Sequence, residues 1–376
     1  MSNETKMANL GALPDWDLGG LFPEPIHPLL DECLAHATAD AQELAQKYRG
    51  QLEVLEAKEL LDLIKAYESL QDKIGRALSF SQLMYAADMS DETNSQLYQN
   101  VQEQCTAIST SLLFVTLEIN RMGSSKINEL LASPILVGYS PWIRDLRVFA
   151  PYQLSDDVEG ILLDKAVTGR AAWVRLFDET IAGLQFFHRG KNINSSEAFD
   201  LMASFDQVVR QEIAEEISGV LSRQLRTLTL ITNTLIKDKE VEDKRRKFAS
   251  PMSARNIENL VEDGIIESLI DAVEKSYPKL SHRYYLMKAE WIGQDQLNYW
   301  DRNAPLPEDE DRLISWESAR SLVLNSYRKF SPTMAETAEL FFEKRWIDAS
   351  VRPGKSPGAF SHPTVPSANP YILLNY

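Results

Sequence analysis

Residues 55–67 read Leu55-Glu56-Ala57-Lys58-Glu59-Leu60-Leu61-Asp62-Leu63-Ile64-Lys65-Ala66-Tyr67. The apolar side chains at positions 60, 61, 63, 64 and 67 recur at the spacing of one face of an α-helix. Most of the chain keeps this spacing between residues that cap helices well. The sequence therefore predicts a mainly α-helical protein.

Capping residues and helix breakers place the individual helices. Pro28 suits the first turn of a helix and Gly50 suits its end, which makes a helical hairpin with the segments that follow. Acidic residues after Ser155 favour another helix start, because carboxylates stabilise the positive end of the helix dipole. Aromatic residues at helical spacing are predicted to be core: Trp173, Phe177, Phe186 and Phe187. The expected helices span about 28–50, 90–123, 168–187 and 195–247, and others follow Ser155, Ser253, Ser315 and Ser331.

The last stretch of the sequence differs in kind. From Ser350 onward, prolines recur too often for a helix to form. Between them, Ala359-Phe360 and Tyr371-Ile372-Leu373-Leu374 favour extended backbone. We therefore expect short β-strands near the C-terminus of a helical protein.

Composition bounds the class of protein. With 376 residues, 44% hydrophobic and 25% charged, the chain is an ordinary globular protein with room for two or three domains. It has no apolar run of about 18 residues, and Met1 to Lys6 is polar, so we expect a cytoplasmic protein without a membrane partner. Two cysteines, Cys33 and Cys105, are too few for a disulfide framework. A formal charge of −16 argues against nucleic acid as a partner.

Several motifs, in the right order along the chain, resemble the oligoendopeptidase F family. The strongest are Trp346-Ile347-Asp348, Gly354-Lys355-Ser356-Pro357-Gly358-Ala359-Phe360 and Asn369-Pro370-Tyr371-Ile372-Leu373-Leu374-Asn375-Tyr376. Others are Trp16-Asp17-Leu18, Arg144-Asp145-Leu146-Arg147 with Leu154-Ser155, His282-Arg283-Tyr284-Tyr285 through Lys288, and Asp301-Arg302. The resemblance implies a mostly helical cytoplasmic peptidase that cuts short unstructured peptides with a zinc-bound water.

The resemblance also implies a division of the chain. Residues 1–110 would form N-terminal helical hairpins, residues 111–190 an oligoendopeptidase F-type N-terminal domain, and residues 191–376 the first portion of the metallopeptidase catalytic domain. We therefore expect a helical N-terminal lobe and an incomplete helical catalytic lobe with short strands.

The zinc motif that this chemistry needs, HExxH, does not occur in the sequence. Two histidines four residues apart lie on one helix face and hold the metal, and the glutamate serves as general base. Here the five histidines are His27, His36, His188, His282 and His362, and no two are four residues apart. We expect no catalytic residue and no specific zinc site in this chain, which would be the N-terminal part of such an enzyme, ending before the motif. A complementary C-terminal chain carrying HExxH and an oligopeptide substrate are the expected partners.

Two other motifs in Gly354-Lys355-Ser356-Pro357-Gly358 fail on physical grounds. The pattern GxSxG would place Ser356 in a nucleophile elbow, but Pro357 has no backbone N–H to give to an oxyanion hole. A phosphate-binding loop would need glycine at Ala349 and a helix after it, which the prolines prevent. The sequence predicts neither a serine hydrolase nor a nucleotide site.

The resemblance gives the glycine-rich segment a role in substrate binding. Gly358, Ala359 and Phe360 are the expected contacts, on an edge strand where a substrate peptide pairs its backbone. A structural turn beside a strand is the competing interpretation. Two other functions stay open for the whole chain: a non-catalytic helical protein that binds peptides or a partner, and a hydrolase that uses other residues of this chain.

Overall fold

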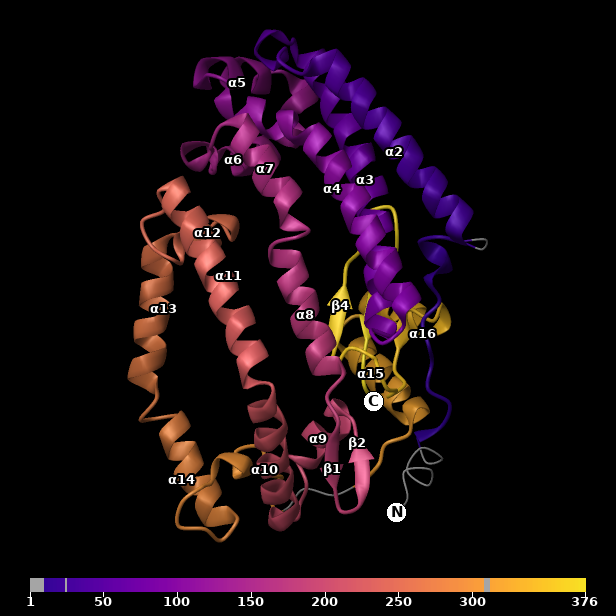
Figure 1. Cartoon of the computed structure of the whole chain (residues 1–376), viewed down its shortest axis with the longest axis vertical. Helices are drawn as coiled ribbons and strands as arrows, with labels where there is room; N and C mark the ends of the chain where they lie inside the picture. The colour runs from indigo at the N-terminus through magenta and orange to yellow at the C-terminus, as the bar shows by residue number, and fades with distance from the viewer. Residues whose placement is uncertain (1–9, 24–25, 308–311) are drawn as a thin grey trace.

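Three long helices at the start of the chain form the largest part of the core (Figure 1). The computed structural model describes residues 10–23, 26–307 and 312–376. The three helices are α2 (Ile26–Tyr48), α3 (Ala57–Ala87) and α4 (Glu92–Arg121), and they pack against one another. Leu60, Leu63 and Ile64 are buried on the inner face of α3, as their spacing predicts.

Local side-chain caps fix where these helices begin and end. Glu56 and Glu59 form a reciprocal capping box at the start of α3, and Asp91 accepts a hydrogen bond from the backbone N–H of Thr93 at the start of α4. Gly50 follows α2 with φ +78°, a conformation that favours glycine. The caps at Ser155, Ser315 and Ser331 also precede helices, which confirms those predictions.

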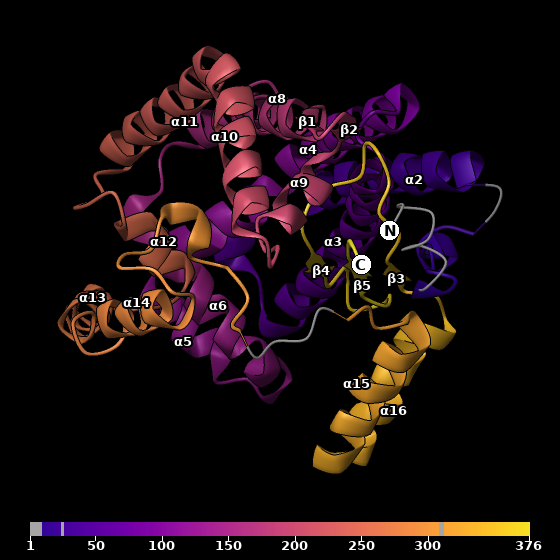
Figure 2. The same ribbon diagram turned by 90° about the horizontal axis from the view of Figure 1, so that it is seen from below.

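Shorter helices extend this first lobe and then build a second layer (Figures 1 and 2). In this layer α7 packs on α4, α8 packs on α11, and α10 contacts α9 and α11. The remaining helices are α5 (Ser124–Leu131), α6 (Ser140–Arg147), α7 (Asp156–Ala166), α8 (Arg170–Ala182), α9 (Ser195–Leu201), α10 (Gln207–Arg223), α11 (Leu225–Arg246), α12 (Ser253–Glu258), α13 (Asp263–Ser276), α14 (Ser281–Trp291), α15 (Trp316–Phe330) and α16 (Pro332–Glu343). Short 3₁₀ turns are η1 (Leu18–Gly20), η2 (Leu52–Val54), η3 (Pro134–Tyr139), η4 (Ala150–Tyr152) and η5 (Tyr299–Asp301).

Within the described residues, five short strands make two small sheets. A hairpin joins β1 (Phe186–His188) to β2 (Lys191–Ile193). Near the C-terminus, β3 (Ile347–Asp348), β4 (Phe360–His362) and β5 (Tyr371–Leu373) form a sheet in the order β3-β5-β4. The structure therefore confirms a mainly helical protein with short strands close to its C-terminus.

The N-terminal segment lies beside this sheet. The backbone N–H of Ala349 donates to the carbonyl of Pro14 at 2.8 Å, and the N–H of Asp17 donates to the carbonyl of Arg345 at 2.7 Å. Tyr371 of β5 is fully buried, donates its hydroxyl proton to the carbonyl of Asp17 and meets the Trp16 ring edge-on. The two ends of the described chain are thus packed together against α3.

Two sequence predictions between residues 168 and 247 were wrong. The helix expected over 168–187 stops at Ala182, because Gly183 follows and a two-residue turn, Arg189-Gly190 with φ of 46° and 85°, closes the hairpin β1–β2. The predicted helix over 195–247 is three helices, since Asp206 caps a new start and Gln224 leaves the helical conformation.

The prediction of an aromatic core in this region was also wrong in part. Phe186 is buried, but Phe177 and Phe187 are 44% and 58% exposed. Phe187 lies in a strand, where successive side chains point to opposite faces of the sheet, so its neighbour Phe186 points inward and Phe187 outward. Helical periodicity was the wrong period to apply there.

A buried ion pair anchors α10 to the segment after α14. Arg210 donates two hydrogen bonds to Asp301 Oδ1, at 3.1 and 2.7 Å, and others to the carbonyls of Ser204 and Phe205. The side chains of Arg210 and Asp301 are 4% and 0% exposed. This pair fixes the break between α9 and α10.

We expect Asp301→Ala to destabilise this region by about 3–5 kcal/mol, because it leaves the Arg210 guanidinium buried without its counter-charge. Urea denaturation and the rate of limited proteolysis near residue 204 measure the loss. The matched control is Asp271→Ala, which breaks the exposed pair with Lys275 and should leave both readouts unchanged. Equal effects of the two variants would contradict the role given to the buried pair.

Candidate substrate-binding strand

Strand β4 forms one edge of the C-terminal sheet. It pairs antiparallel with the central strand β5, with Phe360 opposite Leu373, Ser361 opposite Ile372 and His362 opposite Tyr371. Strand β3 pairs parallel with the other side of β5. An edge strand offers one row of backbone hydrogen-bonding groups to another chain.

The register determines which residues of β4 present that row. The backbone N–H groups of Ile372 and Leu374 donate toward β3, to the carbonyls of Trp346 and Asp348. Alternate residues of a strand point their backbone groups to opposite sides. The backbone groups of Tyr371 and Leu373 therefore face β4, where His362 and Phe360 pair with them. The N–H and carbonyl groups of Ser361 therefore point to the outer edge.

The three predicted contact residues are adjacent in the chain but differ in their exposure and in the hydrogen bonds of their backbone groups. Ala359 is exposed and stands immediately before β4. Gly358 is exposed with φ +81°, and its carbonyl accepts a hydrogen bond from Asn375 Nδ2 at 2.8 Å. Phe360 uses its backbone for β5, and its half-buried ring packs against the main core. The sequence prediction did not include Ser361, which is exposed and whose outward direction follows only from the register.

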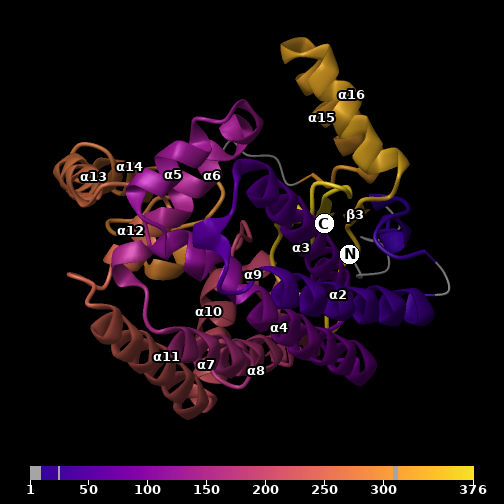
Figure 3. The same cartoon turned by 90° about the horizontal axis from the view of Figure 1, so that it is seen from above.

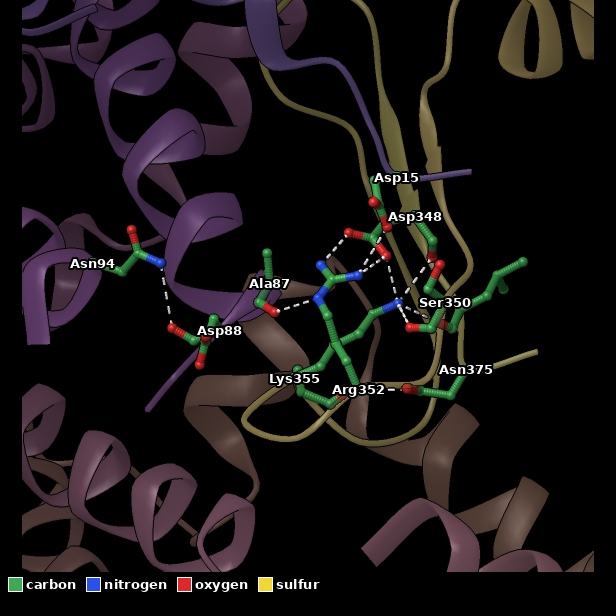
Figure 4. A network of polar contacts seen from close by, with 11 residues as sticks. Asp15, Ala87, Asp88, Asn94, Asp348, Ser350, Arg352, Lys355 and Asn375 are labelled. Atoms are coloured by element: carbon green, nitrogen blue, oxygen red, sulfur yellow. Dashed lines mark hydrogen bonds and ion pairs between the residues drawn. The ribbon is translucent and has the colours of Figure 1, made fainter. Parts of the chain in front are cut away.

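A buried carboxylate holds the loop that leads into β4 (Figure 4). Asp348 accepts a hydrogen bond from Lys355 Nζ at 2.6 Å and two from Arg352, at 2.9 and 2.6 Å. The side chains of Asp348 and Lys355 are 1% and 0% exposed. Lys355 Nζ also donates to the carbonyls of Ser350 and Leu374, so its ammonium group is fully used inside the protein.

These contacts shift the ionisation of the two cations in opposite directions. Burial lowers the pKa of Lys355, and its hydrogen bond to Asp348 opposes that shift. The hydrogen bond to Asp348 raises the pKa of Arg352, which also donates to Asp15. The lysine of the motif GKS is thus a structural cation with no donor left for a phosphate.

The same loop is joined to the end of α3 by backbone contacts. The N–H of Met89 donates to the carbonyl of Gly354, the N–H of Ser356 donates to the carbonyl of Ala86, and Arg352 Nε donates to the carbonyl of Ala87. Gly354 has φ +77°, and a Cβ atom there would collide with the Asp88 carboxylate and the Ser90 hydroxyl. Glycine is required at position 354 for two reasons: the loop lies too close to Asp88 and Ser90 for a side chain to fit, and its φ is positive.

One histidine lies in β4 itself. His362 Nε2 is 2.9 Å from the hydroxyl oxygen of Ser79 on α3, and burial lowers the pKa of the imidazole. A neutral ring suits a hydrogen bond with a hydroxyl group. His362 therefore ties the inner side of β4 to the helical core and leaves the outer edge free of side-chain cover from this residue.

The described residues contain no group of three or more His, Cys, Asp or Glu side chains arranged to hold a metal ion. They do not fit the zinc site that the resemblance implies. Within the same ranges, no helix is both long enough and apolar enough to cross a bilayer.

Comparison with known proteins shows which proteins this chain resembles. Residues 118–186 match the family model described as Oligopeptidase F. The chain is 22% identical to oligopeptidase PepF of Bacillus subtilis (strain 168), over 99% of this chain and 57% of that protein. It is 24% identical to the group B oligopeptidase PepB of Streptococcus agalactiae, over 96% of this chain and 60% of that protein.

The chain is related to the oligoendopeptidase F family. The crystal structure of oligoendopeptidase-F from Enterococcus faecium has the same fold, with a TM-score of 0.69 and 19% identity over 84% of this chain and 61% of that one. The chain spans about three fifths of the length of these relatives.

Residues that carried the family resemblance in the sequence have structural roles. Arg147 donates hydrogen bonds to the backbone carbonyls of Ile119, Asn120 and Met122. These bonds give partners to carbonyl groups at the C-terminal end of α4 that lack a partner within the helix. Asp301 pairs with Arg210, and Asp348 pairs with Lys355. In this oligoendopeptidase F relative, the matching motifs thus mark buried polar contacts of the scaffold.

We expect Gly354→Ala to destabilise the protein by more than Gly50→Ala, although both glycines have φ near +78°. Forcing an L-residue into this conformation costs roughly 1–2 kcal/mol at either position. Only at Gly354 does the new methyl group also meet neighbouring atoms, whereas the space beside Gly50 is open. Urea midpoints compare the two, and a smaller loss for Gly354→Ala would refute the close packing of the loop on α3.

Proposed function

We propose that this chain supplies the scaffold and one wall of the substrate cleft of a zinc-dependent oligoendopeptidase. The observation that carries the proposal is the outer edge of β4, where the backbone groups of Ser361 are directed away from the sheet and the exposed Ala359 stands next to the strand. The matched relatives from Bacillus subtilis and Streptococcus agalactiae are named as oligopeptidases, which supports a peptide as the ligand.

A peptide bound by this edge would add a strand to the sheet. Backbone hydrogen bonds provide affinity in this mode, and they do not depend on the peptide's sequence. Only an extended segment can pair in this way, so folded proteins are excluded as substrates and short unstructured peptides are favoured. The small side chain of Ala359 and the absence of one at Gly358 let the peptide backbone come close.

We assign hydrolysis to a polypeptide segment that this chain does not contain. The sequence has no HExxH motif, and the described residues offer no ligand set for zinc. The chain also spans about three fifths of its relatives' length. Zinc, where the complete enzyme binds it, would supply the hydrolytic chemistry; the residues of this chain would bind the peptide, orient it and form the cleft wall. A cytoplasmic location and the domain division 1–110, 111–190 and 191–376 belong to this proposal.

The proposal predicts that peptide hydrolysis needs two parts. Purified chain with added zinc should not cleave a quenched fluorescent oligopeptide, and the same chain mixed with the segment of PepF from Bacillus subtilis that lies outside the match should. Chelation by 1,10-phenanthroline should abolish the activity of the mixture. Cleavage by the chain alone would overturn the assignment, while saturable peptide binding without cleavage in either case would favour a non-catalytic peptide-binding protein.

Strand addition predicts a specific effect of proline at the edge. Ser361→Pro removes one outward N–H group but leaves the pairing of Phe360 and His362 with β5, so the fold should tolerate it. Loss of one backbone hydrogen bond costs about 0.5–1.5 kcal/mol, and we expect Kd for peptide to rise about 3- to 10-fold. Ser361→Ala keeps the N–H and is the matched control. Fluorescence anisotropy with a labelled peptide measures both, and equal affinities would argue against backbone pairing at this edge.

A further inference from the structure

Two tyrosines meet where α3 ends and α4 begins. The rings of Tyr85 on α3 and Tyr98 on α4 stack with centroids 5.1 Å apart and an angle of 20° between their planes. Tyr85 is 3% exposed, and its hydroxyl oxygen is buried without a hydrogen-bond partner among the described residues. Tyr98 is half-buried, and its hydroxyl group makes no hydrogen bond to a described residue either. A buried hydroxyl group without a partner is unfavourable, so it marks a place where another molecule can supply the partner.

Helix α8 brings charged groups to the same place. Figures 2 and 3 show α8 beside α4, with α3 on the other side of α4. Arg175, Asp178 and Glu179 stand three and four residues apart, so they share one face of α8. Burial raises the pKa of Tyr85, and the charges of Glu179 and Asp178 add to that shift. Burial likewise raises the pKa of Tyr98, with a contribution from Asp178. Both phenol groups therefore lie within electrostatic range of the Asp178 carboxylate.

Asp178 is the charged member of this group that lacks a partner. Arg175 Nε lies 3.8 Å from Glu179 Oε1, so the one nearby cation on α8 is paired with the other carboxylate. Asp178 is half-buried, and no hydrogen bond or ion pair joins it to a described residue. Burial, and next the charge of Glu179, raise the pKa of Asp178, because both disfavour its negative charge. A positive group from another molecule would stabilise the ionised carboxylate.

These groups select the chemistry of the ligand. A divalent metal ion needs several oxygen ligands, and the described residues hold no set of three His, Cys, Asp or Glu side chains to provide them. Water can satisfy the hydroxyl group of Tyr85 but leaves Asp178 without a counter-charge. An ammonium or guanidinium group carries both the charge and several N–H donors. It can donate to the Asp178 carboxylate and to a tyrosine hydroxyl oxygen at the same time.

The segment that leads through β4 crosses one side of α3. Ser79 is 2.9 Å from His362 Nε2 of β4, and the carbonyl of Ala86 accepts a hydrogen bond from the N–H of Ser356. Ser79 and Ala86 are seven residues apart, which is about two helical turns, so they lie on the same side of the helix. Tyr85 directly precedes Ala86 and is turned from this side by about 100°.

The outer edge of β4 faces the flank of α3 that carries Tyr85. The opposite flank carries Arg76, which donates to the carbonyls of Gly20 and Leu21 in the N-terminal segment. Strand β5 lies on that opposite flank too, because Tyr371 donates to the carbonyl of Asp17 in the same segment. The outer edge of β4 is the edge away from β5. A peptide paired with this edge therefore runs on the side of α3 where the two tyrosines lie.

We propose that Asp178, together with the hydroxyl groups of Tyr85 and Tyr98, binds a cationic group of a peptide held at the outer edge of β4. This inference deepens the proposed function and rests on it, because the peptide is the ligand assigned to that edge. It names the substrate class: peptides that carry a lysine or arginine side chain, or their N-terminal ammonium group, at one defined place.

The geometry also sets where in the peptide the cationic group belongs. Tyr85 lies six residues after Ser79, which is about 9 Å along α3. An extended peptide advances about 3.3 Å per residue. The cationic group therefore belongs to a residue about three positions away from the one that pairs with Ser361.

A lysine scan of the peptide tests the site. One lysine is moved through successive positions of a neutral fluorescent peptide whose two ends are blocked, and fluorescence anisotropy gives Kd for each peptide. A second series has no lysine but a free N-terminus, and it grows by one residue at a time, so it separates the N-terminal ammonium group from a side chain. The formal charge of −16 attracts any cation, so the salt concentration is kept at about 0.15 M to screen exposed charges.

We expect one or two neighbouring placements of the cationic group to lower Kd about 10-fold relative to the others, the size of one hydrogen bond to a charged group. Equal affinity for all placements would overturn this inference and leave the proposed function standing. Failure of every peptide to bind, the neutral one included, would overturn both.

Two substitutions that keep the side-chain shape assign the preference to these residues. Asp178→Asn should abolish it, whereas the matched control Glu103→Gln should not, because it removes an exposed carboxylate of α4 that is bonded to Gln99. Tyr85→Phe should raise Kd of the preferred peptide about 3- to 10-fold and leave the neutral peptide unchanged. Its urea midpoint should not fall, since the hydroxyl group has no partner to lose in the folded chain. A lower midpoint for Tyr85→Phe, or a positional preference that survives in Asp178→Asn, would refute the proposed site.

Discussion

The structure around β4 depends on one buried carboxylate. Asp348 lies in β3, and removing its charge from water is costly unless cations take the place of the lost solvent. Lys355 and Arg352 provide these cations, and each also binds backbone carbonyls that belong to other parts of the fold. The group joins β3, the glycine-rich loop, the end of α3 and the residue after β5. Because a partly satisfied buried network is unfavourable, these segments are expected to adopt their positions together.

Sequence reasoning recovered most of the helices and the strands near the C-terminus because their signals are local. Apolar spacing in α3, caps at Ser315 and Ser331, and closely spaced prolines after Ser350 each act within a few residues. The helix predicted over 168–187 failed where a tight turn at Arg189-Gly190 imposed a period of two on residues that also fit a period near four. Local periodicity alone could not resolve that conflict.

The candidate site was harder to predict because it depends on register. Gly358, Ala359 and Phe360 were chosen from a family resemblance, and the segment does lie at a sheet edge. Which backbone groups point outward is decided by the pairing of β4 with β5 and of β5 with β3, and a shift of one residue reverses every direction. Ser361 could therefore not be identified from its own sequence context. The burial of Lys355 was equally hidden, since lysine inside GKS is more familiar as a solvent-facing or phosphate-binding residue.

The packing of Pro14 to Asp17 beside residues 345–349 joins segments separated by more than 300 positions in the chain. During synthesis the N-terminal segment leaves the ribosome long before residues 345–349 do. Trp16 and the end of α3 are therefore synthesised before Tyr371 and the glycine-rich loop, against which they pack in the folded protein. Local contacts within α2, α3 and α4 can form early, but closure of the C-terminal sheet requires a very long loop to be ordered. The outer edge of β4 therefore cannot form until synthesis has reached β5, and a chain that stops before residue 373 has the helical lobe without this edge.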